Sequence, residues 1–555
     1  MGRVWRRPSW SWSWLILAAL LLFDVWLRGH AFGPVVKSWA GFEPYLATSP
    51  ESEPLDCDEA IYGYIGRRLA GGAVMYRDLT ENKPPGGYWL YALAVSVGGA
   101  DETTIRLMPV PFVLATLVLV WRVARRLGGT AAAVLASFTF ALVSTDPFLY
   151  GESANMEHMI NFFAFAALAA LVEGWDKPGR SWLVASGVLL GSACLIKQTS
   201  GLNLVVFAVA LWLRPPPSGS SGSPARSRVM DVLALTLGVA AVSAVAVGVL
   251  LAQGAGAQAF EDVFRYGRAL ATETPPPPNS PPFLMRWVTG NADPEGGLPW
   301  PFGRTNYLVW WGTGTWPVWL AGAAGLVWFG LRPGVTATRR LVAAWTLSAW
   351  VQVALPGLFW QHYYLLPVPG LAVVFGLLTV EAFRLARSWR WPAVVAFLVL
   401  SAALLETTRL QVVEYLRVPP AELVKDRGGP QWLANRALGR EIGRRLAGAR
   451  SPTIFVWGWQ GPLYFYSGLD GGDAAGLRGR LPEDLRRAGT PSGHAQVERT
   501  MRDLAEHPPA VVFAGYPPFP ALRQFLAERY LPSRLSPGLW VRRDVYGVFE
   551  AGTAN

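Results

Sequence analysis

Long apolar runs recur along most of this chain, and they limit its fold more than any motif does. Each run has roughly 17–25 residues, enough for one helix to cross about 30 Å of hydrocarbon. Because 52% of the 555 residues are apolar and only 16% are charged, we expect a mainly α, polytopic membrane protein. About eleven transmembrane helices are predicted, at 12–29, 105–121, 129–147, 156–172, 181–196, 199–213, 231–253, 308–330, 341–357, 363–383 and 391–408.

Basic residues gather at every second boundary between the predicted spans, as in the group Arg122, Arg125 and Arg126. Short cytoplasmic loops concentrate Lys and Arg, so these boundaries predict the cytoplasmic side. The same bias explains most of the net charge of +11. Nucleic acid is therefore not needed as a partner.

The opposite, outer side receives the larger connections, at 31–104, 148–155, 254–306 and everything after about 409. We expect a transmembrane module at 1–408 with a large first outer loop at 31–104. In the extracytoplasmic part, 409–555, the short β-like runs 453–458 and 510–514 alternate with helix-like stretches. This pattern predicts a small α/β domain and places function outside the cytoplasm.

The first outer loop holds the residues best suited to chemistry. Asp58 and Glu59 diverge by about 100° on a helix, so only one of them is a candidate general base. The alternative is that Asp58 only pairs with Arg67, Arg68 or another cation of this loop. Lys83 precedes two prolines, whose stiff backbone suits a phosphate contact. A lysine that merely reaches the membrane interface is the other interpretation of Lys83.

Further polar residues lie at the predicted outer ends of other helices: Asn155, Glu157, His158, Lys197, His362 and Tyr363. Three of the five histidines, His30, His158 and His362, fall at such ends. Together with carboxylates they could bind a divalent metal ion, although polar helix ends are common at interfaces. The sequence leaves the metal open and assigns no other cofactor.

Several motifs in order resemble one family. They are Asp58-Glu59-Ala-Ile-Tyr62, Asn82-Lys83-Pro84-Pro85, Arg106-Leu107, Asn155-Met-Glu157, Lys197-Gln198-Thr199, His362-Tyr363-Tyr364 and Val456-Trp457-Gly458. This series resembles the GT-C glycosyltransferases, in particular bacterial members of the protein O-mannosyltransferase and aminoarabinose transferase family (family 39), including Rgt-type sugar transferases. The resemblance covers about 56–380 and is weak beyond.

The resemblance implies a GT-C fold and an inverting transferase. The enzyme would move a sugar from a polyprenyl-phosphate donor to an envelope acceptor, a glycolipid, polysaccharide or protein, at the outer side of a bacterial cytoplasmic (inner) membrane. Implied roles are catalytic for Asp58, Glu59 and Glu157, donor phosphate-binding for Lys83 and Lys197, and substrate-binding for Tyr62, Asn155, His362 and Tyr363. Aminoarabinose transferases have Glu where this chain has Asn82, so a metal role of that position stays open.

A transporter or flippase of a lipid-linked or anionic substrate is the competing hypothesis. Multiple spans, charged helix ends and Gly/Pro interruptions also fit a transport path. However, transporters of this kind are often built from similar halves, and the sequence shows no internal repeat. The large, asymmetric first outer loop also favours the transferase.

Overall fold

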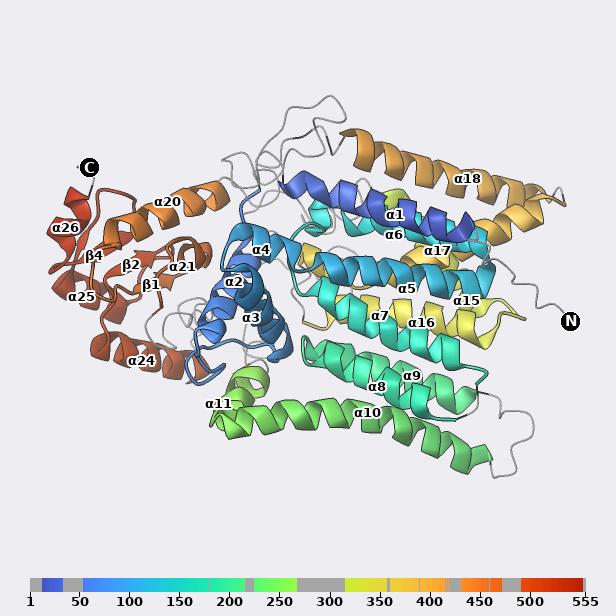
Figure 1. The fold of residues 1–555 in the computed structure, drawn as a ribbon, viewed down its shortest axis with the longest axis horizontal. Helices are drawn as coiled ribbons and strands as arrows, with labels where there is room; N and C mark the ends of the chain where they lie inside the picture. Colours follow the sequence, from blue (N-terminus) through green and yellow to red (C-terminus); the bar gives the residue numbers. More distant parts are fainter. Residues whose placement is uncertain are drawn as a thin grey trace, which may run out of the picture.

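The computed structural model describes residues 12–32, 53–177, 179–214, 224–266, 315–356, 360–388, 390–414, 416, 418, 431–458, 460–471 and 491–552. Most long helices lie side by side in one bundle (Figure 1). Helices α2 (Cys57–Ala70), α3 (Gly86–Gly98) and α4 (Glu102–Leu107) cover one end of that bundle, and the C-terminal part lies beyond them.

Each predicted span overlaps a helix in the described part of the chain: α1 (Trp12–Arg28), α5 (Val110–Gly128), α6 (Thr130–Ser144), α7 (Glu157–Gly174), α8 (Ser181–Cys194), α9 (Leu202–Leu213), α10 (Pro224–Ala252), α15 (Trp316–Leu331), α16 (Ala337–Ala354), α17 (Val368–Ala386) and α18 (Trp391–Thr408). The start of the predicted span 308–330, at 308–314, lies outside the described residues. Four stretches are long and apolar enough to cross a membrane by themselves: Glu102–Gly128, Arg226–Ala252, Val368–Ala386 and Trp391–Val412. The mainly helical membrane architecture is confirmed.

The second span differs from the prediction in its boundaries. The sequence placed it at 105–121, whereas α5 begins at Val110 after the N-cap residue Pro109 and runs to Gly128. Proline has no N–H to donate, so it separates the short α4 from α5. The basic residues expected after the span lie in the last turns of α5, where the negative end of the helix dipole favours them.

Helix α10 reaches the bundle through glycines. A Cβ on Gly238 would lie 2.3 Å from the carbonyl oxygen of Val184, and one on Gly187 would meet Leu235 at 2.0 Å. Small residues let two helices approach closely in a membrane, where no hydrophobic force drives them together. The α8–α10 contact therefore depends on the absence of side chains at these positions.

Short helical segments join the long helices: η1 (Gly29–Phe32), η2 (Pro147–Leu149), η3 (Gln198–Gly201), α11 (Gly256–Phe260), η4 (Glu261–Tyr266), η6 (Gln361–Leu365) and η7 (Arg409–Glu414). The predicted outer loop 254–306 is described as far as Tyr266, and its remainder lies outside the described residues.

The C-terminal part contains the predicted sheet. Its elements are α20 (Gln431–Leu446), β1 (Ile454–Trp457), α21 (Pro462–Tyr466), α24 (Pro491–Glu506), β2 (Val511–Ala514), α25 (Pro520–Arg529), β3 (Tyr530–Pro532), β4 (Leu539–Arg542) and α26 (Tyr546–Ala551). The strand order is β1-β2-β4-β3, in which β1 and β2 are parallel and the other pairs antiparallel. The small α/β sheet is therefore present, while the domain boundary at 408/409 stays a prediction.

Candidate functional site

The first turn of α2 is fixed by a reciprocal cap. The Oδ1 atom of Asp56 accepts a hydrogen bond from the Glu59 N–H (2.7 Å), and Glu59 Oε2 accepts one from the Asp56 N–H (2.8 Å). This capping box satisfies two backbone donors at the start of the helix. The sequence carried the signal, an N-cap residue followed three positions later by Glu, but our sequence analysis missed it.

Glu59 is fully buried and has further partners. Its Oε1 accepts a hydrogen bond from the Ala154 N–H and lies 3.0 Å from Nε of Arg106. Arg106 also pairs with Glu53 at 3.3 Å. Burial raises the pKa of Glu59 to about 8, against the lowering effect of Arg106. These contacts favour a positioning role for Glu59 over the predicted catalytic one.

Asp58, unlike Glu59, is only partly buried. Its Oδ2 accepts a hydrogen bond from the hydroxyl of Tyr62, one turn later in α2 (2.8 Å). The Nζ atom of Lys83 lies 5.1 Å from the centre of the Tyr62 ring, within cation–π range. The same ring contacts Tyr88 and Tyr91 of α3 edge-on. The predicted base and the predicted phosphate-binding lysine therefore flank one tyrosine.

The segment around Lys83 is docked against the α8–α9 junction. The hydroxyl of Tyr76 donates to the Lys83 carbonyl (2.7 Å), and the Gly86 N–H donates to the carbonyl of Leu195 (2.7 Å). A Cβ on Gly86 would lie only 2.7 Å from that carbonyl oxygen. Glycine at this position thus permits the approach that brings Lys83 toward Lys197.

Lys197 lies at this junction and is buried. Its Nζ is 3.0 Å from Oε1 of Glu157 and 3.3 Å from the centre of the Tyr363 ring. Burial lowers the pKa of Lys197, and the charge of Lys83 acts in the same direction, while Glu157 and Asp58 oppose it. The two lysines and both carboxylates therefore interact electrostatically.

Asn155 and His362 complete the group. Asn155 Nδ2 donates to Oδ2 of Asp56 (3.0 Å), and the His362 ring contacts Tyr363 edge-on at 4.7 Å. Burial raises the pKa of Asp56, with the charge of Asp58 adding to it and that of His362 lowering it. The structure thus brings the residues with an implied catalytic or binding role into one connected group, whereas His158 contacts the Gly151 carbonyl at 2.9 Å. The role of each residue stays a prediction.

Tyr91 of α3 is a member of the group that the sequence analysis did not single out. Its hydroxyl donates to the carbonyl of Ala154. Burial raises its pKa well above the usual value, and the charges of Glu59, Asp56, Asp58 and Glu157 add to the effect. Nothing in the aromatic sequence of α3 distinguishes Tyr91 from its neighbours.

Among the described residues, no group of three or more His, Cys, Asp or Glu side chains could hold a metal ion. The divalent metal considered from the sequence remains a prediction.

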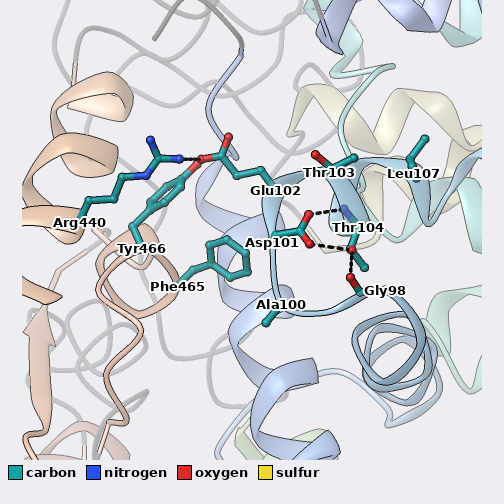
Figure 2. Close-up of a pocket in the computed structure, with 10 residues that line it drawn as sticks. All are labelled: Gly98, Ala100, Asp101, Glu102, Thr103, Thr104, Leu107, Arg440, Phe465 and Tyr466. Carbon is teal, nitrogen blue, oxygen red and sulfur yellow. Dashed lines mark hydrogen bonds and ion pairs between the residues drawn. The ribbon is translucent and has the colours of Figure 1, made fainter. Parts of the chain in front are cut away.

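A surface hollow lies between the α3–α4 turn and the C-terminal part (Figure 2). Ala100, Glu102 and Leu107 line one side, and Arg440, Phe465 and Tyr466 line the other. The residues predicted for the site do not line it. The hollow marks the seam between two parts of the molecule.

Sequence comparison gives relatives with named activities. A family model described as dolichyl-phosphate-mannose-protein mannosyltransferase matches residues 82–247. Undecaprenyl phosphate-alpha-4-amino-4-deoxy-L-arabinose arabinosyl transferases from Pseudomonas aeruginosa and Pseudomonas paraeruginosa are each 26% identical over 211 residues, 37% of this chain. The match spans 33% of the length of each of these relatives.

Structural comparison covers nearly the whole chain. ArnT from Cupriavidus metallidurans bound to undecaprenyl phosphate has a TM-score of 0.56 at 16% identity, over 96% of this chain and 98% of ArnT. The apo oligosaccharyltransferase of Archaeoglobus fulgidus has a TM-score of 0.52 at 13% identity, over 92% of this chain and 70% of that protein. The overall fold that the motif series implies is confirmed.

Proposed function

We propose that this chain, a GT-C glycosyltransferase of the aminoarabinose transferase and protein mannosyltransferase kind, moves a sugar from a polyprenyl-phosphate donor to an envelope acceptor. The observation that carries the proposal is the convergence of Asp58, Lys83 and Lys197 from three separate segments. One carboxylate and two ammonium groups are the charges that this reaction needs.

The proposed step is a direct displacement. An acceptor hydroxyl oxygen attacks the anomeric carbon, its proton passes to Asp58, and the bond from that carbon to the phosphate oxygen breaks. The electron pair leaves with the polyprenyl phosphate, whose charge Lys83 and Lys197 stabilise. Attack opposite to the leaving group inverts the anomeric centre.

The surroundings of Asp58 suit a general base. The Tyr62 hydroxyl orients one carboxylate oxygen at 2.8 Å, while the capping box and Arg106 hold the helix that carries it. A base must lie within hydrogen-bond reach of the proton that it removes. The fixed start of α2 therefore keeps Asp58 in position, and the residues that fix it need not act as bases themselves.

We further propose that the site faces the outer side of the cytoplasmic membrane. The site helices and the C-terminal sheet share one end of the bundle (Figure 1), and the basic boundaries predict that the cytoplasm is at the other end. A periplasmic reporter fused after Arg409 should be active, and one fused within 218–227 should be inactive. The reverse pattern would contradict this orientation.

The test of the activity is mass spectrometry of envelope glycolipids, polysaccharides and glycoproteins from a deletion strain beside its parent. The parent should contain a sugar-modified species that the deletion strain lacks, and the chain supplied from a plasmid should restore it. Identical envelopes would contradict the proposal. The comparisons give no support to the transporter or flippase considered from the sequence.

A further inference from the structure

The segment that leads into α2 is held from two sides. On one side, Arg106 donates to the carbonyl of Pro54 at 2.8 Å and pairs with Glu53. On the other side, the buried N–H of Leu55 donates to the hydroxyl oxygen of Tyr466 at 2.8 Å. The next residue, Asp56, is the N-cap of α2. The position of the helix start therefore depends on both contacts.

Tyr466 is itself fixed at the seam between α4 and the C-terminal part. Glu102 of α4 pairs with Arg436 at 3.2 Å and with Arg440 at 2.9 Å. Arg436 is also a hydrogen-bond partner of the Tyr466 hydroxyl. Figure 2 shows Tyr466 and the Arg440–Glu102 pair beside the hollow. Because the seam is incompletely filled there, these polar contacts help to join its two sides.

A second contact reaches the same turn of α2. Gly461 precedes α21 and packs on Ile61, where a Cβ would lie 2.2 Å from Cδ1 of Ile61 and 3.4 Å from Sγ of Cys57. At such a short distance, Ile61 or the backbone at position 461 would have to move. A methyl group at position 461 would thus press against the turn that carries Asp58.

From these contacts we infer that Tyr466 is a positioning residue, through which the C-terminal part holds the first turn of α2 and sets the place of Asp58. The inference rests on the proposed role of Asp58 as the base. Lys83 and Lys197 belong to other segments, and the backbone around Lys83 is held by Tyr76 and Leu195 rather than by the C-terminal part. The C-terminal part therefore acts on the acceptor side of the reaction and leaves donor binding unchanged.

Two variants of the full-length protein test the inference. Tyr466→Phe keeps the ring but removes the acceptor of the Leu55 N–H, and Gly461→Ala presses on Ile61. Gly448→Ala is the matched control, because a Cβ there meets nothing within 4 Å. Turnover is measured in detergent with a lipid extract of the deletion strain, which supplies unused donor and acceptor, and is expressed per folded molecule.

We expect kcat to fall by about 10- to 100-fold in both variants, since a shift of about 1 Å at a reacting group has effects of this size. The apparent KM for the extracted donor should stay within about twofold of the parent value, which indicates unchanged donor binding. The control should match the parent. A Tyr466→Phe protein with parental kcat, or with a raised donor KM at parental kcat, would overturn the inference.

Hydrogen exchange of the peptide covering 53–60 gives a readout that does not require activity. Both variants should lose amide protection there, and Gly448→Ala should not. Parental protection in Tyr466→Phe would overturn the inference whatever the turnover. If the parent itself fails to transfer sugar from the extract, the proposed function fails, and exchange still decides whether Tyr466 holds this turn.

Discussion

Replacing Arg106 by glutamine should strongly destabilise the outer end of the protein. The Arg106 side chain is only 4% exposed, and its partners Glu53 and Glu59 are 3% and 0% exposed. Arg106→Gln removes the cation between two buried carboxylates. Breaking a buried pair in this way costs about 3–5 kcal/mol, whereas an exposed pair is worth about 0–1 kcal/mol. The loss of stability therefore distinguishes a buried ion pair from an exposed one.

Thermal unfolding of the purified protein in detergent measures the effect. Arg440→Gln is the matched control, because that arginine is 51% exposed and Glu102 keeps Arg436 as a partner. The melting midpoint should fall several-fold more for Arg106→Gln than for the control. At low pH the two buried carboxyl groups bind protons and avoid the cost of an unpaired buried charge. The difference in melting midpoint between Arg106→Gln and the control should therefore grow as the pH rises. Equal, small shifts at pH 8 would refute the buried network as a source of stability.

Further substitutions follow from the same site. Lys83→Ala should weaken binding of the proposed polyprenyl phosphate by about 1.5–3 kcal/mol, the size of a charge-assisted hydrogen bond, and Lys83→Arg should recover part of this loss. Unchanged affinity in a lipid-binding assay would contradict this prediction. Lys197→Ala should weaken the same binding less. It should also lower the melting midpoint, because it leaves the buried Glu157 without this partner. Adding Glu157→Gln should recover the midpoint but not the affinity. Glu59→Gln tests the pH dependence of stability. The pKa of Glu59 is about 8 in the folded protein, against 4.5 when unfolded, so the protonated side chain stabilises the fold. This stabilisation is complete below about pH 4.5 and is lost as the pH rises to about 8. The substitution should flatten that decline in melting midpoint, and an unaltered pH profile would count against the shifted pKa.

The spans and the site residues were predictable for different reasons. A transmembrane helix is encoded locally, by the length and hydropathy of one segment, so each predicted span overlaps a helix. Its ends are encoded less clearly, and the break at Pro109 shifted the second span. The site residues lie at helix ends and in the motif series, and these two features predict Asp58, Lys83 and Lys197 without any knowledge of their contacts.

The contacts that fix Asp58 could not be predicted from sequence. Leu55 and Tyr466 are separated by 411 positions, and no periodicity links them. The resemblance implies a catalytic role for Glu59, and the sequence does not reveal that this side chain is buried. Its pairing with Arg106 and its hydrogen bond from the Ala154 N–H appear only when α2, α4 and the loop before α7 are placed together.

The most direct test of the central claim is the turnover of Asp58→Asn beside its thermal stability. The arginines that were alternative partners, Arg67 and Arg68, lie 3.4 and 3.7 Å from Asp470. Asparagine keeps the shape of Asp58 but cannot take a proton, so sugar transfer from the extracted donor should fall by about 10²–10⁴-fold. The melting midpoint should stay near that of the parent. Parental turnover in a well-folded Asp58→Asn protein would remove Asp58 from the reaction.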